Sequence, residues 1–357
     1  KKPMNVLFIA TDDMRADLQV YGHKLAKTPN LDKLAKDGVL FERAYCQYPL
    51  CGPSRASLLT GRKPTNSGLY GNREWYGASF PDWKSIPMYF KEQGYVTWRT
   101  GKIFHGGIDD TDAWVEGGEV RDHNAPINTD APSAVSPTQY YANIWRSAPK
   151  LTEGADSSVR SDRWGAVDGD EAQNLGDTKV GDRALDFIRR SKNQKEPFFL
   201  AVGFSKPHTP FIAPKEFFDL YDKEEIQLPV NFSSLPVVPI GFPQGATRLR
   251  NTDLFINRTA SVDESKDFIQ AYLACISYVD WNVGRLLDEL EKQGLRENTL
   301  IVFWSDHGYQ LGERGKWSKA GSLWEQGTRV PFIIYDPRAK GNGTSSSRTV
   351  ELIDIYP

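Results

Sequence analysis

Short runs of apolar and β-branched residues recur along the chain and predict the strands of one sheet. Near-continuous apolar runs are typical of parallel strands that are covered on both faces. The runs are Met4 to Ala10, Tyr95 to Thr100, Pro197 to Val202, Thr299 to Trp304 and Phe332 to Tyr335. Apolar residues at helical spacing predict helices from about Asp177 to Ser191 and from Lys266 to Gln293. We therefore predict an α/β fold, with a mainly parallel mixed sheet sandwiched by helices.

Start and stop signals predict two shorter helices. The segment Thr28 to Gly38 has Thr as its cap, Pro in its first turn and Gly as its stop. The segment Ser85 to Gln93 is amphipathic and is closed by Gly94. Residues Val39 to Pro49 are expected only to connect the first of these helices to the next element.

Residues from about 106 to 173 lose the apolar period and are rich in Gly, Asp, Ser, Pro and Trp. This stretch is too long for a plain connection, so we predict surface loops inserted into a single domain that covers residues 1–357. Trp114, Trp145 and Trp164 could stack on sugar faces, but each is predicted to be a structural anchor, which is the commoner role of Trp.

Polar residues directly follow the first four predicted strands. The chemically active ones are Asp12, Asp13, Lys102, His105, Lys206, His208, Asp306 and His307. Ligands of open α/β sheets bind at the carboxyl ends of the strands, so we expect these side chains to gather there. The neighbouring carboxylates of Asp12 and Asp13 repel each other unless a cation joins them. Taken alone, the pair also fits a helix cap or an Asx turn, and the Pro-flanked turn around His208 also fits a loop without a chemical role.

Cys51 is predicted to begin a helix that ends near Gly61, because Pro53 suits a first helical turn. Free N–H groups at a helix N-terminus favour a developing anion. Arg55 would lie one turn further along and face the same way. The alternative is a buried structural Cys, which is the usual state of a free Cys.

The stretch Cys51 to Arg62 resembles the signature of the type I sulfatases, whose Cys is oxidised after translation to formylglycine. The stretch Gly94 to His105 resembles the second signature of the same family. Its Lys and His are three residues apart, as in the iduronate-2-sulfatase subfamily. The resemblance implies an alkaline phosphatase type of fold. Sulfatases usually continue into a small C-terminal subdomain, which we expect to be missing from this chain.

The resemblance also implies a division of roles. Cys51 would become an aldehyde hydrate, of which one hydroxyl attacks sulfur and the other later expels sulfate. A Ca²⁺ ion, with Mg²⁺ as the other possibility, would be held by Asp12, Asp13, Cys51, Asp306 and His307. Lys102 and Arg55 would stabilise the hydrate, and His105 would take the proton in the elimination step. His208 would protonate the leaving oxygen, and Lys319 would bind sulfate. Lys206, Lys319 and Trp317 are the candidate substrate-binding residues.

Composition narrows the partners. A formal net charge of -2 gives no global basic field, so we expect no nucleic-acid partner. No apolar run approaches the about eighteen residues of a membrane span. Three cysteines, Cys46, Cys51 and Cys275, cannot form a disulfide framework. By resemblance, the partners are a sulfated carbohydrate and a formylglycine-generating maturation enzyme. We expect an exported protein, periplasmic or secreted, although no signal peptide is seen.

Three functions remain open at this stage. The first is an exo-acting carbohydrate sulfatase, with sulfated algal polysaccharides such as ulvan or carrageenan and glycosaminoglycans as candidate substrates. The second is a phosphonate or phosphodiester hydrolase of the same superfamily. The third is a non-catalytic carbohydrate-binding relative in which Cys51 is never converted. No motif in the sequence names the sugar.

Overall fold

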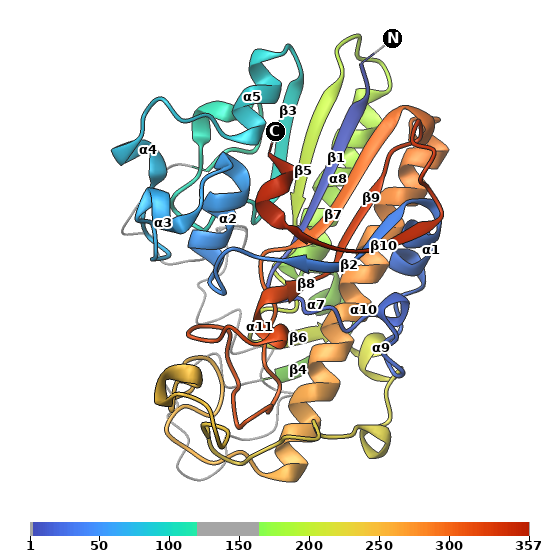
Figure 1. Cartoon of the computed structure of the whole chain (residues 1–357). Helices are drawn as coiled ribbons and strands as arrows, with labels where there is room; N and C mark the ends of the chain where they lie inside the picture. Colours follow the sequence, from blue (N-terminus) through green and yellow to red (C-terminus); the bar gives the residue numbers. More distant parts are fainter. Residues whose placement is uncertain (1–2, 120–163, 357) are drawn as a thin grey trace.

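The computed structural model describes residues 3–119 and 164–356. Within this part, the main sheet has eight strands in the order β10-β2-β9-β7-β1-β5-β3, and β8 pairs with β2 (Figure 1). These strands are β1 (Asn5–Thr11), β2 (Val39–Tyr45), β3 (Val96–Gly101), β5 (Phe198–Gly203), β7 (Thr299–Ser305), β8 (Arg329–Val330), β9 (Phe332–Tyr335) and β10 (Thr344–Glu351). A separate two-stranded sheet joins β4 (Trp164–Val167) to β6 (Phe211–Pro214).

Helices cover both faces of the main sheet. The described α-helices are α1 (Pro29–Asp37), α2 (Cys51–Thr60), α3 (Pro64–Ser67), α4 (Tyr76–Ser79), α5 (Ile86–Glu92), α7 (Gly169–Gln173), α8 (Gly176–Ser191), α9 (Lys215–Phe218), α10 (Val262–Lys292) and α11 (Glu325–Thr328). Helices α1, α8 and α10 lie on one side of the sheet, and α2 and α5 lie on the other (Figure 1). The predicted α/β sandwich is confirmed.

Strand β1 shows why its sequence is a continuous apolar run. Leu7 and Ile9 belong to the core that β1 shares with α1, α8 and α10, whereas Val6 and Phe8 belong to the core on the α2 and α5 side. Successive side chains of a strand point to opposite faces, so a strand covered on both faces needs apolar residues at every position.

Strands β3, β5, β1 and β7 are mutually parallel neighbours, whereas β9 runs antiparallel between β7 and β2. The sheet is therefore mixed, as predicted. Because the four parallel strands share a direction, their carboxyl ends lie at one edge, and the polar residues that follow them meet there.

Helix α10 fixes α1 through one buried carboxylate. Asp280 accepts hydrogen bonds from the N–H of Leu31 at 2.7 Å and from the side chain of Asn30 at 2.8 Å. Both acceptor contacts lie at the first turn of α1, where backbone N–H groups lack partners within the helix. Burial outweighs these bonds and raises the pKa of Asp280 to about 6.

Three parts of the chain differ from the sequence prediction or cannot be fully compared with it. Residues predicted only to lead to Cys51 contain β2, and the polar stretch that forms β10 was not predicted at all. The region predicted as surface loops lies mostly outside the described residues, since 120–163 are not described. Its described end contains β4 and α7, so it is not entirely irregular.

Of the three Trp residues in this region, Trp145 lies outside the described part. The other two predictions of structural anchors are confirmed, because Trp114 is buried and Trp164 packs against Phe218.

Among the residues that the structure describes, no helix combines the length and the apolar character that crossing a membrane requires.

Candidate active site

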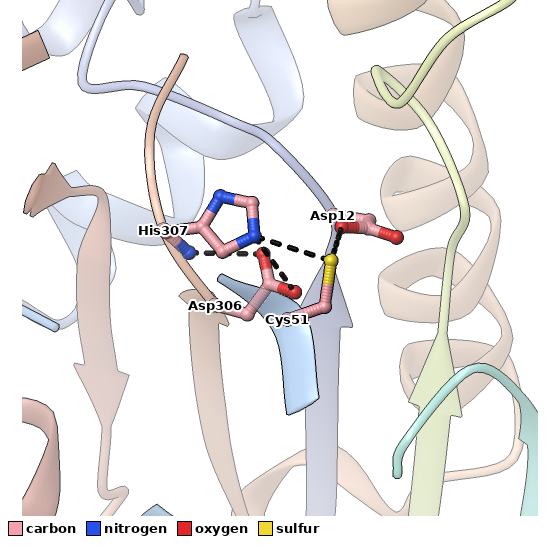
Figure 2. Close-up of side chains that lie close together, drawn as sticks. All are labelled: Asp12, Cys51, Asp306 and His307. Carbon is pink, nitrogen blue, oxygen red and sulfur yellow. Dashed lines mark hydrogen bonds and ion pairs between the residues drawn. The ribbon is translucent and has the colours of Figure 1, made fainter. Parts of the chain in front are cut away.

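Four side chains from three segments meet at the carboxyl ends of β1 and β7 (Figure 2). Asp12 follows β1, Asp306 and His307 follow β7, and Cys51 begins α2. One potential ligand atom from each lies within 4.8 Å of the other three. An overlapping group at the same spacing consists of Asp12, Asp13, Cys51 and His208. The structure thus brings all five residues of the predicted metal site together.

Asp13 turns into this space through a left-handed backbone with a φ of 64°. Its N–H donates to Asp306 Oδ1 at 3.2 Å, and its carbonyl accepts from the Tyr272 hydroxyl at 2.7 Å. No described residue donates a hydrogen bond to its buried Oδ1, although His307 Nδ1 lies 3.3 Å away. Burial raises the pKa of Asp13 well above its usual range, against the opposing charge of Lys319. A bound cation would give the Asp13 Oδ1 a partner and would offset the burial of the Asp13 carboxylate.

Cys51 is almost completely buried within the cluster. Its Sγ lies 3.4 Å from Asp12 Oδ1 and 3.3 Å from His307 Nε2. Burial, together with the charge of Asp12, raises the pKa of the Cys51 thiol well above its usual value. The thiol is therefore neutral, and it is a poor nucleophile in this form.

The N-terminus of α2 offers fewer free N–H groups than predicted. Gly52 N–H donates to Asn72 Oδ1 at 2.8 Å, and Pro53 has no N–H. An anion at Cys51 must consequently be stabilised mainly by side-chain cations rather than by this helix end.

The Arg55 side chain is fully buried and donates hydrogen bonds to residues that follow several strands. Its Nε donates to Asp306 Oδ2 at 2.8 Å. Its terminal nitrogens donate to the carbonyls of Lys102 at 2.5 Å, Ile103 at 3.0 Å and Thr11 at 3.0 Å. These bonds use four of the five N–H groups of a guanidinium. Arg55 thus positions Asp306, and its charge also acts on Cys51; its role in stabilising the hydrate stays a prediction.

Two lysines hold the site carboxylates. Lys102 Nζ pairs with Asp12 Oδ2, and Lys319 Nζ lies 2.8 Å from Asp13 Oδ2. Burial alone would raise the pKa of Asp12, but Lys102 and other nearby cations hold it well below its usual range. Burial alone would lower the pKa of Lys319, but Asp13 and Asp253 raise it well above normal. Asp12, Lys102 and Lys319 are therefore charged, whereas the raised pKa of Asp13 favours its protonated form.

Two histidines flank the cluster in the neutral state. Burial and the charge of Lys102 lower the pKa of His105 to about 3. Burial and Lys319 also lower the pKa of His208, whose side chain is 33% exposed and whose Nε2 lies 4.0 Å from Asp13 Oδ2. His208 Nδ1 lies 2.6 Å from the Thr209 carbonyl, to which it can only donate. In the neutral ring Nε2 therefore carries no proton, so His208 must take one up before it protonates a leaving oxygen.

Two predicted substrate-binding residues have other roles. Trp317 is fully buried, with ring centroids 4.9 Å from Phe255 and 6.1 Å from Phe268. The prediction that it contacts a sugar is wrong, because the ring is part of the core. Lys206 Nζ donates to the carbonyls of His208 at 3.0 Å and Pro210 at 2.7 Å. It organises the loop that carries His208, instead of projecting towards sulfate as predicted.

Sequence reasoning missed two residues of the site. Asn72 holds the backbone next to Cys51, and Asp253 Oδ2 lies 3.7 Å from Lys319 Nζ. Gly71 and Asn72 together predict a turn, but this signal does not show that Asn72 will contact the first turn of α2. Asp253 lies in an irregular segment without any periodic signal.

The donor set fits a divalent cation. Asp12, Asp13 and Asp306 supply carboxylate oxygens, and His307 supplies an imidazole nitrogen. The undonated Oδ1 of Asp13 shows that the protein alone does not satisfy this site. Carboxylate oxygens suit Ca²⁺ and Mg²⁺, whereas an imidazole also suits softer metals.

Comparisons with known proteins agree with this geometry. The Sulfatase family profile matches residues 4–357. The chain is 36% identical to human iduronate 2-sulfatase over 347 residues, covering 94% of this chain and 60% of that protein. It is 36% identical to a sulfatase of Formosa agariphila over 370 residues, covering 99% of this chain and 68% of that protein. A phosphonate monoester hydrolase of Agrobacterium radiobacter shares the fold, with a TM-score of 0.71 at 23% identity over 99% of this chain and 72% of the other.

Proposed function

Because this chain belongs to the sulfatase family, we propose that it hydrolyses a sulfate ester on a carbohydrate, using a formylglycine made from Cys51. One observation carries the proposal. The residue at the start of α2 that would be converted lies within 4.8 Å of potential ligand atoms on Asp12, Asp306 and His307. The chain spans 60% of the human relative, so residues 1–357 are proposed as the catalytic domain and not as the whole of such an enzyme.

The cations of the site suit a sulfate monoester, which keeps one negative charge up to the transition state. Lys102 and Lys319 stay charged beside Cys51 and can stabilise oxygens of the sulfate group. Each is anchored on a carboxylate, Asp12 or Asp13, so neither must reorganise when substrate binds. Arg55 Nε donates to Asp306 Oδ2 and so holds this carboxylate in position.

The converted Cys51 would supply a geminal diol, whose hydroxyl is the nucleophile that attacks sulfur. A divalent cation, which we propose to be Ca²⁺ with Mg²⁺ as the other option, would supply a Lewis acid that lowers the pKa of that hydroxyl. Asp12, Asp13, Asp306 and His307 would hold it. Conversion needs a maturation enzyme, and we propose that the protein is exported, as many sulfated polysaccharides are extracellular.

The two neutral histidines are suited to moving protons. His105, whose pKa is about 3, stays an acceptor at neutral pH and can take the proton of the remaining hydroxyl as sulfate leaves. His208 lies on the more exposed side, where a sugar would enter, and is proposed to protonate the leaving oxygen once it has gained a proton.

The direct test uses the chain produced together with a formylglycine-generating enzyme, with conversion of the Cys51 peptide verified by intact mass. We expect turnover of sulfate esters to exceed turnover of matched phosphate esters and phosphonates. A panel of defined sulfated oligosaccharides then identifies the sugar. A Cys51→Ala variant that folds normally should have no activity. Preference for the phosphorus esters would overturn the proposal in favour of a phosphonate hydrolase, and a folded, converted chain without any activity would favour a binding protein.

A further inference from the structure

The side chains around Cys51 have the spacing of a tetrahedral metal site that includes the sulfur. Cys51 Sγ lies 3.3 Å from His307 Nε2 and 3.4 Å from Asp12 Oδ1, and His307 Nε2 lies 3.6 Å from Asp306 Oδ2 (Figure 2). In tetrahedral zinc sites the Zn–S bond is about 2.3 Å and the Zn–N and Zn–O bonds are about 2.0 to 2.2 Å. Tetrahedral angles then place sulfur roughly 3.6 Å from the other ligand atoms and nitrogen roughly 3.4 Å from oxygen. The observed distances differ from these values by a few tenths of an ångström, which small side-chain movements can supply.

The second observation is the orientation of His307. Its imidazole is fully buried, and its Nδ1 lies 2.9 Å from the Gly308 carbonyl. A carbonyl oxygen only accepts hydrogen bonds, so Nδ1 carries the proton and the lone pair of Nε2 points to Cys51 Sγ. A backbone acceptor that fixes the tautomer in this way is the usual support of a metal-binding histidine.

The carboxylates are supported in the same manner. Asp306 Oδ1 accepts from the N–H groups of Asp13 and His307, and Asp306 Oδ2 accepts from Arg55 Nε. Asp12 directs Oδ2 to Lys102 and Oδ1 to the sulfur. Asp12 therefore keeps Oδ1 facing the space beside Cys51, and Asp306 Oδ2 lies 3.6 Å from His307 Nε2 while it also accepts from Arg55.

We propose that, when Cys51 remains a thiol, this cluster is a Zn²⁺ site with Cys51 Sγ, His307 Nε2, Asp12 and Asp306 as its ligands. Thiolate and imidazole ligands favour Zn²⁺ over the hard cations, which prefer oxygen. Binding forms the Zn–S bond and releases the thiol proton to solvent, without any oxidation or reduction. The thiolate and two carboxylates exceed the charge of Zn²⁺ by one. Lys102 pairs with Asp12, Arg55 pairs with Asp306, and the charge of Lys319 also acts on Cys51.

Conversion of Cys51 removes the sulfur and leaves oxygen ligands and one histidine. The state of one residue thus selects the class of metal, a soft ion before conversion and a hard ion after it. An unconverted chain loaded with zinc lacks the aldehyde, and its thiolate is held by the metal. The part of this inference that concerns the converted form rests on the proposed function, whereas the zinc site of the thiol form does not.

The test uses the full chain produced without a formylglycine-generating enzyme, with an unmodified Cys51 confirmed by intact mass. After chelation of bound metal, Co²⁺ is titrated as a spectroscopic substitute for zinc, and Zn²⁺ affinity is measured by competition with a chromophoric chelator. Cys51→Ala removes the proposed sulfur ligand. Cys275→Ala is the matched control, because this buried free thiol lies on α10, outside the cluster.

We expect a sulfur-to-cobalt charge-transfer band and intense tetrahedral d–d bands in the unmodified chain and in Cys275→Ala. Both should be missing in Cys51→Ala. Loss of even an outer-shell partner weakens metal binding by about 10- to 100-fold, so loss of this ligand should weaken Zn²⁺ binding by about 100-fold or more. Ca²⁺ affinity should change far less. A spectrum without the sulfur band, or equal Zn²⁺ affinity in the unmodified chain and Cys51→Ala, would overturn the inference.

The two proposals fail separately. A converted chain that hydrolyses sulfate esters, beside a thiol chain that shows no sulfur–cobalt band, refutes only the zinc site. A thiol chain that binds zinc through Cys51, beside a converted chain without sulfatase activity, refutes only the proposed function.

Discussion

Replacing Arg55 by Met should strongly destabilise the protein, because the guanidinium neutralises a buried carboxylate. The Arg55 Nε to Asp306 Oδ2 contact is 2.8 Å, and both side chains have an exposed fraction of 0%. Removing one partner of a buried ion pair typically costs about 3 to 5 kcal/mol. The carbonyls of Lys102 and Ile103 also lose a donor, and a buried acceptor left without one costs about 1 kcal/mol or more. We therefore expect a loss of at least about 4 kcal/mol.

Urea unfolding measures this loss, with Trp fluorescence as the signal. The Trp304 ring lies 5.6 Å from the Arg55 guanidinium carbon and reports on this region. Arg189→Met is the matched control. Arg189 pairs with Glu289 at 3.0 Å, but its side chain is 54% exposed, so about 0 to 1 kcal/mol should be lost.

A loss of about 4 kcal/mol is a large part of the 5 to 15 kcal/mol that is typical of folded proteins, so Arg55→Met could fail to fold. Arg55→Lys is the fallback, because it keeps the charge but cannot reproduce the planar fork. It should lose less stability than Arg55→Met and more than Arg189→Met. If either Arg55 variant matches the stability of Arg189→Met, Arg55 does not hold the strand ends together as described.

Three further predictions concern catalysis, positioning and pH. General acid help is worth about 10²- to 10⁴-fold, so His208→Ala should lose about that much rate on a sugar sulfate and distinctly less on a nitrophenyl sulfate; equal losses would place His208 in sulfate binding instead. Asn72→Leu should lower kcat more than it changes KM, because Gly52 N–H loses its acceptor beside Cys51, whereas Asn72→Asp keeps an acceptor and should retain activity; similar kinetics in both variants would rule out this role. Asp280 has a folded pKa of about 6, above its unfolded value, so the folded state binds the proton more tightly than the unfolded state. Loss of that proton as pH rises from about 4 to 6 should therefore lower the free energy of unfolding by up to about 3 kcal/mol. Urea unfolding from pH 4 to 7 should show this slope in the unmodified chain and lose it in Asp280→Asn; parallel curves would contradict the buried, raised pKa.

The parts of the molecule that the sequence predicts are those in which each residue obeys a local rule. A strand buried on both faces must be apolar throughout, as β1 is, and such strands end where polar residues resume. Asp12 and Asp306 were therefore placed at the same edge of the sheet without knowledge of the strand order. The cap and stop signals of α1 likewise fixed its ends to within one residue of Pro29–Asp37.

What the sequence does not predict depends on partners that are distant along the chain. Strand β10 is largely exposed and polar, and it is a strand because it pairs in parallel with β2. Nothing adjacent to Trp317 shows that Phe255 and Phe268 will enclose it. Arg55 contacts Asp306 in the site, as its place one turn after Cys51 allows, but its bonds to carbonyls from two other segments arise only when the sheet is complete.

The hydrogen bond from Asp13 N–H to Asp306 Oδ1 joins residues 293 positions apart. Contacts between such distant residues close a very long loop, whose entropy must be lost before the contact forms, so pairings of this kind slow folding. The cluster that surrounds Cys51 consequently does not exist in any partly folded chain that lacks either β1 or β7. A metal ion that needs ligands from both ends of the chain binds only the completed sheet, and it shifts the folding equilibrium towards that state. Occupancy of the site by metal thus reports that the whole domain has folded.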